Sequence, residues 1–327
     1  MNTTFHTVLD PCGICLGTAT MGTDISVIDS YTVLDTYFEL GGNFVDTAHI
    51  YAAWVENGWG ASERTLGEWI KSNGLRKQII LATKGGHPPM SKMDGWRCGA
   101  EDLLHDLEES LERLQTDFID VYWLHRDDPA RHVGEIIDTL ADFVVQGLIG
   151  AYGASNWSTE RIDEANAYAK EKGLPPFVAS QPGWSLADRA PDAPMIPGLV
   201  FVDESIRRWH RQKYLAMVPY TSQATGYFGE ANVAWAKAGF LNDPPRGRDY
   251  DTAGNRKRLL ECIKIAEYKH CTPNQVALAY LRDQRFPVFP IVGTGKPDHI
   301  KEALEALEIT LSITERKRLR TIGEDIG

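Results

Sequence analysis

Four side chains that could transfer a proton follow three successive runs of apolar residues. Asp46 lies near the end of the first run and Tyr51 shortly follows it, Lys84 ends the second, and His125 ends the third. Because a phenol with its ordinary pKa of about 10 is a weak acid at neutral pH, we expect Lys84 to lower the pKa of Tyr51, and Asp46 to keep the lysine charged. His125 could then hydrogen-bond a carbonyl oxygen. The group predicts proton donation to a carbonyl, and a nicotinamide cofactor would supply the hydride that it lacks.

The runs that carry these residues belong to a longer alternation of short apolar runs and amphipathic stretches. Runs rich in β-branched and aromatic residues predict strands over Ile14–Thr18, Phe44–Thr47, Ile79–Lys84, Phe118–His125, Ile149–Ala154, Phe177–Gln181, Tyr214–Tyr220 and Val288–Val292. Apolar residues at helical spacing predict helices over Ser62–Lys71, Ala100–Leu114, Val133–Val145, Glu160–Lys172, Glu204–Gln212, Asn255–Lys269 and Ile313–Ile322. Eight strands that alternate with helices predict an α/β fold, the (β/α)8 TIM barrel with a parallel eight-stranded barrel. We expect residues 1–327 to form a single domain of this kind.

Alternation within the predicted strands places the polar candidates on the same faces as apolar neighbours. Lys84 shares a face with Ala82, and His125 shares a face with Trp123. If these faces point into the barrel, apolar side chains fill its interior and polar ones lie only at its mouth. The active site of such a barrel lies at the C-terminal ends of its strands, where all four candidates are expected.

Composition limits the classes of partner. The chain has 327 residues with 34 Lys and Arg against 45 Asp and Glu, a net charge of −11, which disfavours nucleic acid. No apolar stretch approaches the roughly 20 residues that span a bilayer, and we expect no secretory signal. Five cysteines are too few for a disulfide scaffold, and the Cys12–Cys15 pair lacks a second pair of ligands for a metal. We therefore expect a cytoplasmic protein without metal, membrane or nucleic-acid partners; its oligomeric state stays open.

The motifs around the four candidates resemble one known family. The string Gly42–Ala48, followed by Tyr51, resembles the signature of the aldo-keto reductases. Lys84 in Ala-Thr-Lys and His125 in Asp-Val-Tyr-Trp-Leu-His match the other catalytic motifs of that family in order and context, and the resemblance covers nearly the whole chain. It implies that Tyr51 is the general acid, that Lys84 and Asp46 adjust its pKa, and that His125 orients the carbonyl.

The same resemblance implies a nicotinamide cofactor, although no G-x-G-x-x-G string is present for a Rossmann site. Ser155, Asn156 and Gln181 would hold the nicotinamide carboxamide, and Tyr220 would stack on the ring. The other implied contacts are Gly17, Thr18, Thr221, Ser222, Gly293, Thr294, Lys296, His299 and Glu302. NADP(H) is favoured because Lys296 could meet a 2′-phosphate. NAD(H) remains an alternative because Gly293 stands where many NADPH-specific members carry a cation.

Residues in the loops at the predicted mouth suggest the substrate. The candidates for substrate binding are Trp54, Trp96, Trp184 and Arg126. Each tryptophan could either line the substrate pocket or pack in the hydrophobic core. Flat aromatic faces that alternate with polar groups suit a sugar-like substrate. The expected function is NAD(P)H-dependent reduction of an aldehyde or ketone, a small-molecule carbonyl of polar character, to an alcohol. The alternative is a non-enzymatic nicotinamide-binding subunit that senses redox state.

Overall fold

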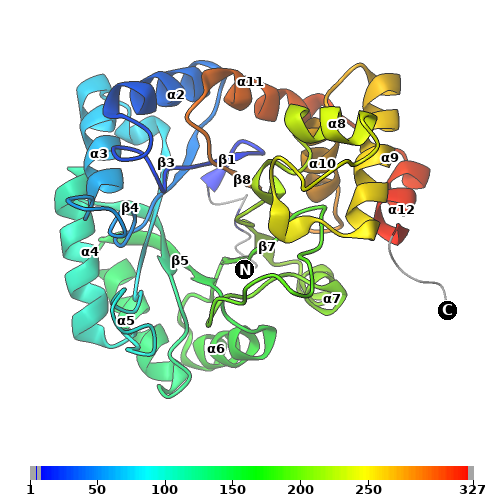
Figure 1. Ribbon diagram of the computed structural model, residues 1–327. Coiled ribbons are helices and arrows are strands. Elements are labelled where there is room, and N and C mark those ends of the chain that lie inside the picture. The colour runs from blue at the N-terminus through cyan, green and yellow to red at the C-terminus, as the bar shows by residue number, and fades with distance from the viewer. Residues whose placement is uncertain (1–4, 6–8, 323–327) are drawn as a thin grey trace.

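Eight parallel strands form the centre of the molecule (Figure 1). The structure, a computed structural model, describes residue 5 and residues 9–322. The strands are β1 (Cys15–Gly17), β2 (Phe44–Asp46), β3 (Ile80–Gly85), β4 (Ile119–Leu124), β5 (Ile149–Ser155), β6 (Ala179–Gln181), β7 (Ala216–Met217) and β8 (Ile291–Val292). They pair in the order β7-β6-β5-β4-β3-β2-β1-β8. This order is the predicted (β/α)8 arrangement, in which each strand lies beside its neighbour in sequence and β8 returns to β1.

The barrel closes between β7 and the chain that leads into β8. Met217 forms an isolated parallel bridge with Val288. The Met217 N–H donates to the carbonyl of Pro287, and the Phe289 N–H donates to the carbonyl of Met217, each at 2.9 Å. The predicted strand at 214–220 shortens to two residues, because Tyr214 caps α7 in the left-handed conformation and Pro219 has no N–H to donate to a ladder.

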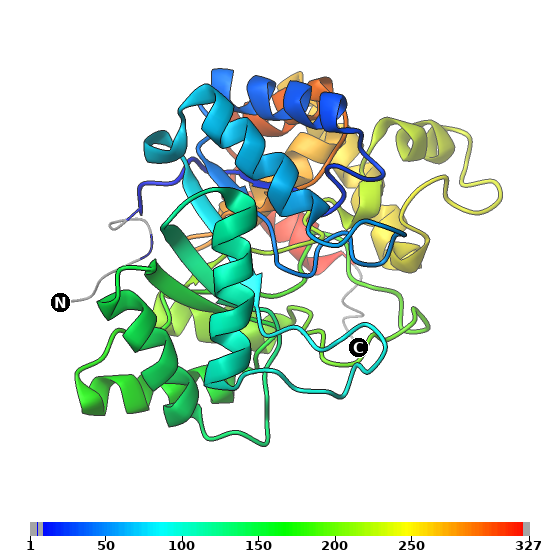
Figure 2. The same ribbon diagram turned by 90° about the vertical axis from the view of Figure 1, so that its left-hand side faces the viewer.

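The helices follow one another around the strands in chain order, and α11 packs beside α2 to complete the ring (Figure 1). They are α2 (Val27–Glu39), α3 (Ala61–Asn73), α4 (Ala100–Leu114), α5 (Val133–Val145), α6 (Thr159–Lys172), α7 (Glu204–Lys213), α8 (Glu230–Lys237), α9 (Ala253–Lys269), α10 (Pro273–Arg282), α11 (Pro297–Glu305) and α12 (Ile313–Thr321). Figure 2 shows α8 and the chain that leads to α9 projecting from the barrel. Among the helices of residues 9–322, none has both the length and the apolar character that crossing a membrane requires.

Side chains alternate between two apolar layers along the strands, as predicted. One layer fills the barrel interior and includes Phe44, Ala82, Val121, Trp123 and Ala216. The other lies between strands and helices and includes Val45, Leu81, Tyr122, Leu124 and Tyr152. The interior layer forms an apolar floor, so polar side chains on the same faces are confined to the barrel mouth.

Local signals at helix ends agree with the sequence. The side chains of Ser158 and Thr272 cap α6 and α10, and Thr272 completes a capping box with Gln275. Gly173 ends α6 in the left-handed conformation at φ 68°. The Ser158 cap therefore fixes where the loop that follows β5 ends.

Candidate active site

Lys84, near the end of β3, connects three of the four predicted catalytic side chains. Its Nζ donates to Oδ2 of Asp46 at 2.5 Å, to the carbonyl of Thr47 at 2.7 Å and to the hydroxyl of Tyr51 at 2.8 Å. An ammonium group has three protons, so these three bonds use all of them. Lys84 and Asp46 are each only 1% exposed. The amine is therefore held in one position, with the Tyr51 hydroxyl as its outermost partner.

The protonation of Tyr51 differs from the sequence expectation. Burial raises the pKa of the phenol, and the opposing effect of Lys84 does not cancel that rise. Burial acts to lower the pKa of Lys84, but Asp46 and Tyr51 prevail and raise it. Lys84 does act to lower the pKa of Tyr51, as predicted, but the expectation left out the cost of a buried phenolate, which keeps the pKa above its usual value. At neutral pH the phenol is protonated and the amine is charged, which are the forms that proton donation needs.

His125 follows β4 and lies beside Tyr51, with ring centroids 5.9 Å apart. Burial, and then the nearby His87 and Lys84, lower the pKa of His125 well below its usual value. The imidazole is therefore neutral, and its Nδ1 is buried without a hydrogen-bond partner among the described residues. All four predicted catalytic residues thus meet at the mouth of the barrel.

A second imidazole, His87, lies against the first, with ring centroids 4.7 Å apart. Its Nδ1 is 2.6 Å from the carbonyl of Pro88. Because a carbonyl oxygen only accepts, Nδ1 carries the proton and Nε2 is left as an acceptor. Burial lowers the pKa of His87 to about 4. His87 was not among the predicted site residues, although its place three residues after Lys84 puts it in the loop that follows β3.

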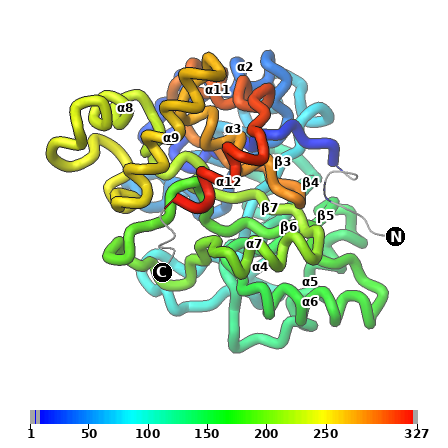
Figure 3. Tube along the Cα trace, turned by 90° about the vertical axis from the view of Figure 1, so that its right-hand side faces the viewer, coloured from blue at the N-terminus to red at the C-terminus, as the bar shows by residue number. Residues whose placement is uncertain are grey.

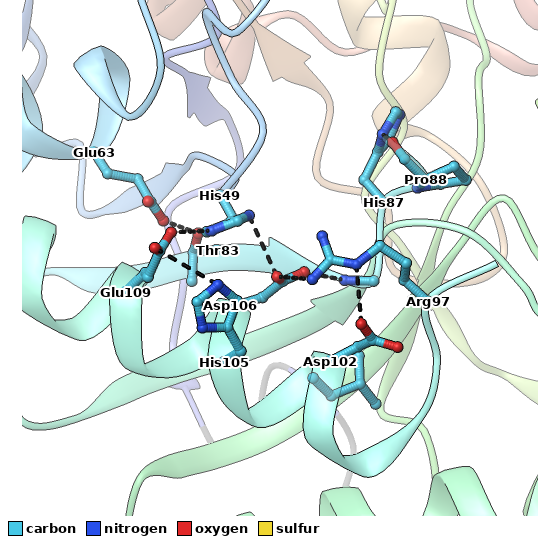
Figure 4. A network of polar contacts seen from close by, with 12 residues as sticks. His49, Glu63, Thr83, His87, Pro88, Arg97, Asp102, His105, Asp106 and Glu109 are labelled. Carbon is cyan, nitrogen blue, oxygen red and sulfur yellow. Dashed lines mark hydrogen bonds and ion pairs between the residues drawn. The ribbon is translucent and has the colours of Figure 1, made fainter. Parts of the chain in front are cut away.

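Buried polar contacts fasten the loops that carry Tyr51 and His87 to α4 (Figure 4). Nε2 of His49 lies 2.7 Å from a carboxylate oxygen of Glu109. Asp106, fully buried, accepts from the Gly86 N–H at 2.9 Å and from Arg97 at 2.6 Å. One helix therefore positions the loop before Tyr51 and the loop before His87 at once.

The four residues expected at the nicotinamide meet at the ends of β5, β6 and β7. Ser155 donates to the carbonyl of Gln181 at 2.8 Å, and the Asn156 amide donates to Ser155 Oγ at 3.0 Å. The Tyr220 hydroxyl donates to Oδ1 of Asn156 at 2.6 Å. Gln181 donates to Oδ1 of Asp46 at 2.9 Å. Amides, a hydroxyl and a half-buried phenol ring fit a carboxamide and its ring, and they adjoin the catalytic group directly.

A second group of predicted cofactor residues forms an exposed turn at the start of α11. Thr294 Oγ1 lies 3.1 Å from Nδ1 of His299 and accepts from the Lys296 N–H at 3.1 Å. Gly293 and Lys296 are exposed beside them. A cation at a helix N-terminus suits the phosphate end of a dinucleotide. Where the barrel closes between β7 and β8, the hydroxyl of Ser222 donates to the carbonyl of Ile291 at 2.5 Å.

The other predicted cofactor contacts are engaged within the protein. Thr18 is buried, and its hydroxyl donates to the carbonyl of Asp46 at 3.1 Å. The Glu302 carboxylate accepts from Thr272 at the start of α10. Gly17 lies against Ile291, where a Cβ would come within 2.7 Å of that side chain. Thr221 adopts a positive φ of 54° and donates to the carbonyl of Tyr220 at 2.7 Å.

The predicted substrate residues do not all come together. The ring of Trp54 is 6.2 Å from that of Tyr51 and 47% exposed. Arg126 is buried, donates to the His125 carbonyl at 3.2 Å and keeps its Nε without a described partner. Trp96 is exposed in the loop between β3 and α4. Trp184 is buried against a separate cavity of about 400 Å³.

The cysteines give no sign of metal chemistry. The Cys12 thiol donates to the carbonyl of Ile14 at 2.9 Å, and Cys15 is buried inside the barrel. Burial raises the pKa of the Cys15 thiol well above its usual value. Within the part of the chain that the structure describes, no group of three or more His, Cys, Asp or Glu could hold a metal ion. These contacts agree with a packing role for Cys12 and Cys15.

Comparisons with known proteins agree with this geometry. The model of the aldo/keto reductase family matches residues 13–324. An aryl-alcohol dehydrogenase of Pestalotiopsis microspora is 29% identical over 91% of this chain and 73% of its own length. Norsolorinic acid reductase A of Aspergillus parasiticus is 29% identical over 96% and 80%. A Klebsiella pneumoniae aldo/keto reductase, crystallised with NADP and acetate, has the same fold with a TM-score of 0.68, 24% identity and coverage of 95% and 91%. The chain belongs to the aldo/keto reductase family and is an NAD(P)-dependent oxidoreductase.

Proposed function

We propose that this protein reduces a polar aldehyde or ketone to an alcohol, with Tyr51 as the general acid and NADPH as the preferred cofactor. The observation that carries the proposal is the set of three hydrogen bonds that the Lys84 ammonium donates to Asp46, to the carbonyl of Thr47 and to the hydroxyl of Tyr51. The nicotinamide supplies the hydride when it is bound. The Klebsiella relative crystallised with NADP supports that cofactor class.

Three residues of this chain carry out the proton transfer and orient the carbonyl. Tyr51 donates its hydroxyl proton to the carbonyl oxygen as negative charge develops there. Lys84, 2.8 Å from that hydroxyl, stabilises the phenolate that is left. His125 is neutral and donates a hydrogen bond that fixes the carbonyl. The general acid thus loses its proton beside a fixed positive charge.

The neighbours of His125 suit a substrate with a hydroxyl group next to its carbonyl, as in a sugar-derived aldehyde or ketone. His87 offers Nε2 as an acceptor, and Arg126 offers a buried N–H donor that has no described partner. Trp54 adds a flat face at the rim for C–H groups. A site with free polar groups of both kinds binds hydroxylated ligands better than alkyl chains, because alkyl chains leave those groups unpaired.

The proposal is tested by following NADPH absorbance with matched carbonyls. Glyceraldehyde and keto-sugars should exceed propionaldehyde, medium-chain aldehydes and steroid ketones in kcat/KM. In a His87→Leu variant the preference for glyceraldehyde over propionaldehyde should fall by about 3- to 10-fold, the value of one hydrogen bond. A Tyr268→Phe variant, altered at a phenol of α9 that is 81% exposed, is the control.

Two results would count against parts of the proposal. Benzaldehyde reduced faster than every hydroxylated carbonyl would favour the aryl-alcohol chemistry in the name of the Pestalotiopsis relative. Tight NADPH binding without turnover of any carbonyl would favour the redox-sensing alternative.

A further inference from the structure

A second cavity, of about 400 Å³, lies apart from the catalytic residues. Its walls come from the loop after β6, from α7, α9, α10 and the last turn of α12, and from the short helix Arg248–Tyr250. Figure 3 shows α7, α9 and α12 on one flank of the molecule. Neither Tyr51, Lys84 nor His125 lines this cavity. Its size is that of a site for a small organic molecule.

Two arginines in its wall have N–H groups to spare. Arg258 is only 7% exposed, and its Nε and Nη1 donate to the Leu319 carbonyl, to Asp188 and to Asn255. These three bonds use Nε and Nη1 and leave the two N–H groups of Nη2 for another acceptor. Arg207 donates through Nη1 to the Tyr280 hydroxyl at 3.2 Å and pairs through Nη2 with Glu204 at 2.7 Å.

The third nitrogen of Arg207, Nε, is buried and has no partner within residues 9–322. A buried donor without an acceptor is unfavourable, so this guanidinium suits an added acceptor. Arg320 also lines the cavity, and its side chain forms no ion pair with a described residue. Tyr280 lines the same cavity as Arg207, Arg258 and Arg320, and its hydroxyl accepts the hydrogen bond from Arg207.

The acidic residues of the cavity wall do not neutralise the positive charge of these arginines. Asp188 and Glu204, which pair with the two arginines, have side chains 72% and 43% exposed, so water screens them. Asp203 is engaged in capping α7, where it accepts from the Ile206 N–H at 2.9 Å. The buried side of the cavity therefore keeps an excess of positive charge.

The remaining wall is aromatic. Trp184, Phe201, Tyr250 and Tyr280 line it, and the guanidinium of Arg189 lies 4.5 Å from the centroid of the Phe201 ring. Planar rings beside guanidinium groups favour a planar anion, because the ring packs on the aromatic faces while its charge meets the arginines.

We propose that this cavity is a second ligand site, which binds a small aromatic carboxylate on Arg207 and Arg258. The carboxylate takes the spare N–H groups of the two arginines, and the ring lies against Trp184 and Tyr250. The site does not depend on the proposed reductase function, since it shares none of the catalytic residues.

Isothermal titration calorimetry with benzoate and with benzamide, its uncharged isostere, tests the proposal. Benzoate should saturate one site with a Kd below about 1 mM, and benzamide should bind at least tenfold more weakly. R207M should weaken benzoate binding by about tenfold or more, the effect of losing a charge-assisted hydrogen bond. R285M, at an exposed arginine outside the cavity, should leave it unchanged.

R258M removes contacts to Leu319 and Asn255 and so risks the fold; R207K is the safer second variant. R207K keeps the positive charge but loses the planar guanidinium with its several N–H donors, so its affinity for benzoate should fall between those of wild type and R207M. Equal affinity for benzoate and benzamide, or no saturation, would overturn the proposal. So would benzoate binding that survives R207M but is lost in H125A, because the anion would then lie at the catalytic residues.

Discussion

The amide of Gln181 donates to Oδ1 of Asp46 at 2.9 Å, while Lys84 donates to Oδ2 of the same carboxylate. One buried carboxylate thus fixes both the partner of the proposed acid and a residue proposed to hold the nicotinamide. Burial raises the pKa of Asp46, against the opposing effect of Lys84. In the proposed mechanism, Asp46 would therefore help to position both the proton donor and the nicotinamide.

Replacing this carboxylate should cost both stability and activity. Asp46→Asn leaves the buried Lys84 without its counter-charge, and breaking a buried pair costs about 3–5 kcal/mol. Urea unfolding followed by circular dichroism measures the loss. The control is Asp298→Asn, which removes an exposed carboxylate at the start of α11. A loss below about 1 kcal/mol, the size of a surface ion pair, would contradict the role given to Asp46.

Removing the Tyr51 hydroxyl should stop the chemistry and spare the cofactor. General acid catalysis contributes about 10²–10⁴-fold, so Tyr51→Phe should lower kcat by at least that factor. NADPH affinity, measured by fluorescence titration, should stay near the wild-type value. Tyr268→Phe, at a phenol 81% exposed, serves as control. A Tyr51→Phe enzyme with half of its activity would show that another group donates the proton.

Lys84 and Tyr51 should act as one unit. Lys84→Met removes the charge that stabilises the phenolate, so its loss in kcat should approach that of Tyr51→Phe. The double variant should then be little worse than either single one. Losses that multiply would show instead that the two side chains act independently.

Two buried histidines predict how stability depends on pH. Burial lowers the pKa of His210 and of His87 to about 4, from an ordinary 6.5. Between those values the unfolded chain binds protons that the folded chain does not, so stability falls as pH falls from about 6.5 to 4. Urea unfolding at pH 7.5, 6 and 5 should show this slope. His210→Asn should flatten it, whereas His105→Gln, at an exposed position, should not.

Cofactor preference should depend on Lys296. If this exposed amine meets the 2′-phosphate of NADPH, Lys296→Ala should lower kcat/KM for NADPH and leave that for NADH nearly unchanged. Wild-type enzyme should favour NADPH moderately, because Gly293 adds no second cation. A preference for NADH above tenfold, about 1.4 kcal/mol, would reverse the assignment.

The sequence predicted the strands and most helices because their patterns were strong. The apolar spacing of Ala100–Leu114 and Val133–Val145 predicted both helices to the residue. No helix was predicted at Val27–Glu39, which is rich in Val, Ile, Thr and Tyr, residues typical of strands. It is helical because Val33, Leu34 and Tyr37 bury one face against the barrel. Here tertiary packing, and not the secondary-structure propensity of the residues, determines that the segment is a helix.

The catalytic group was predictable and its surroundings were not. Asp46, Tyr51, Lys84 and His125 lie in motifs with fixed spacing to a strand end. His87 meets His125 because β3 and β4 are paired in a register that places Gly85 beside Leu124. Gln181 of β6 meets Asp46 of β2 only through the curvature of the barrel. The pKa of Tyr51 likewise depends on how deeply the phenol is buried, which no spacing in the sequence reveals.

The short strands at the closure of the barrel have a consequence for local opening. β7 and β8 are two residues each, and an isolated bridge joins Met217 to Val288. We expect amide hydrogens at 214–220 and 287–292 to exchange before those of β3 to β5, because fewer bonds must break there. Tyr220–Ser222 and Gly293–Lys296 continue directly from the two sides of this junction. A dinucleotide that contacts both segments would hold β7 and β8 together. Local opening of the barrel at this junction would then be least frequent when the nicotinamide cofactor is bound.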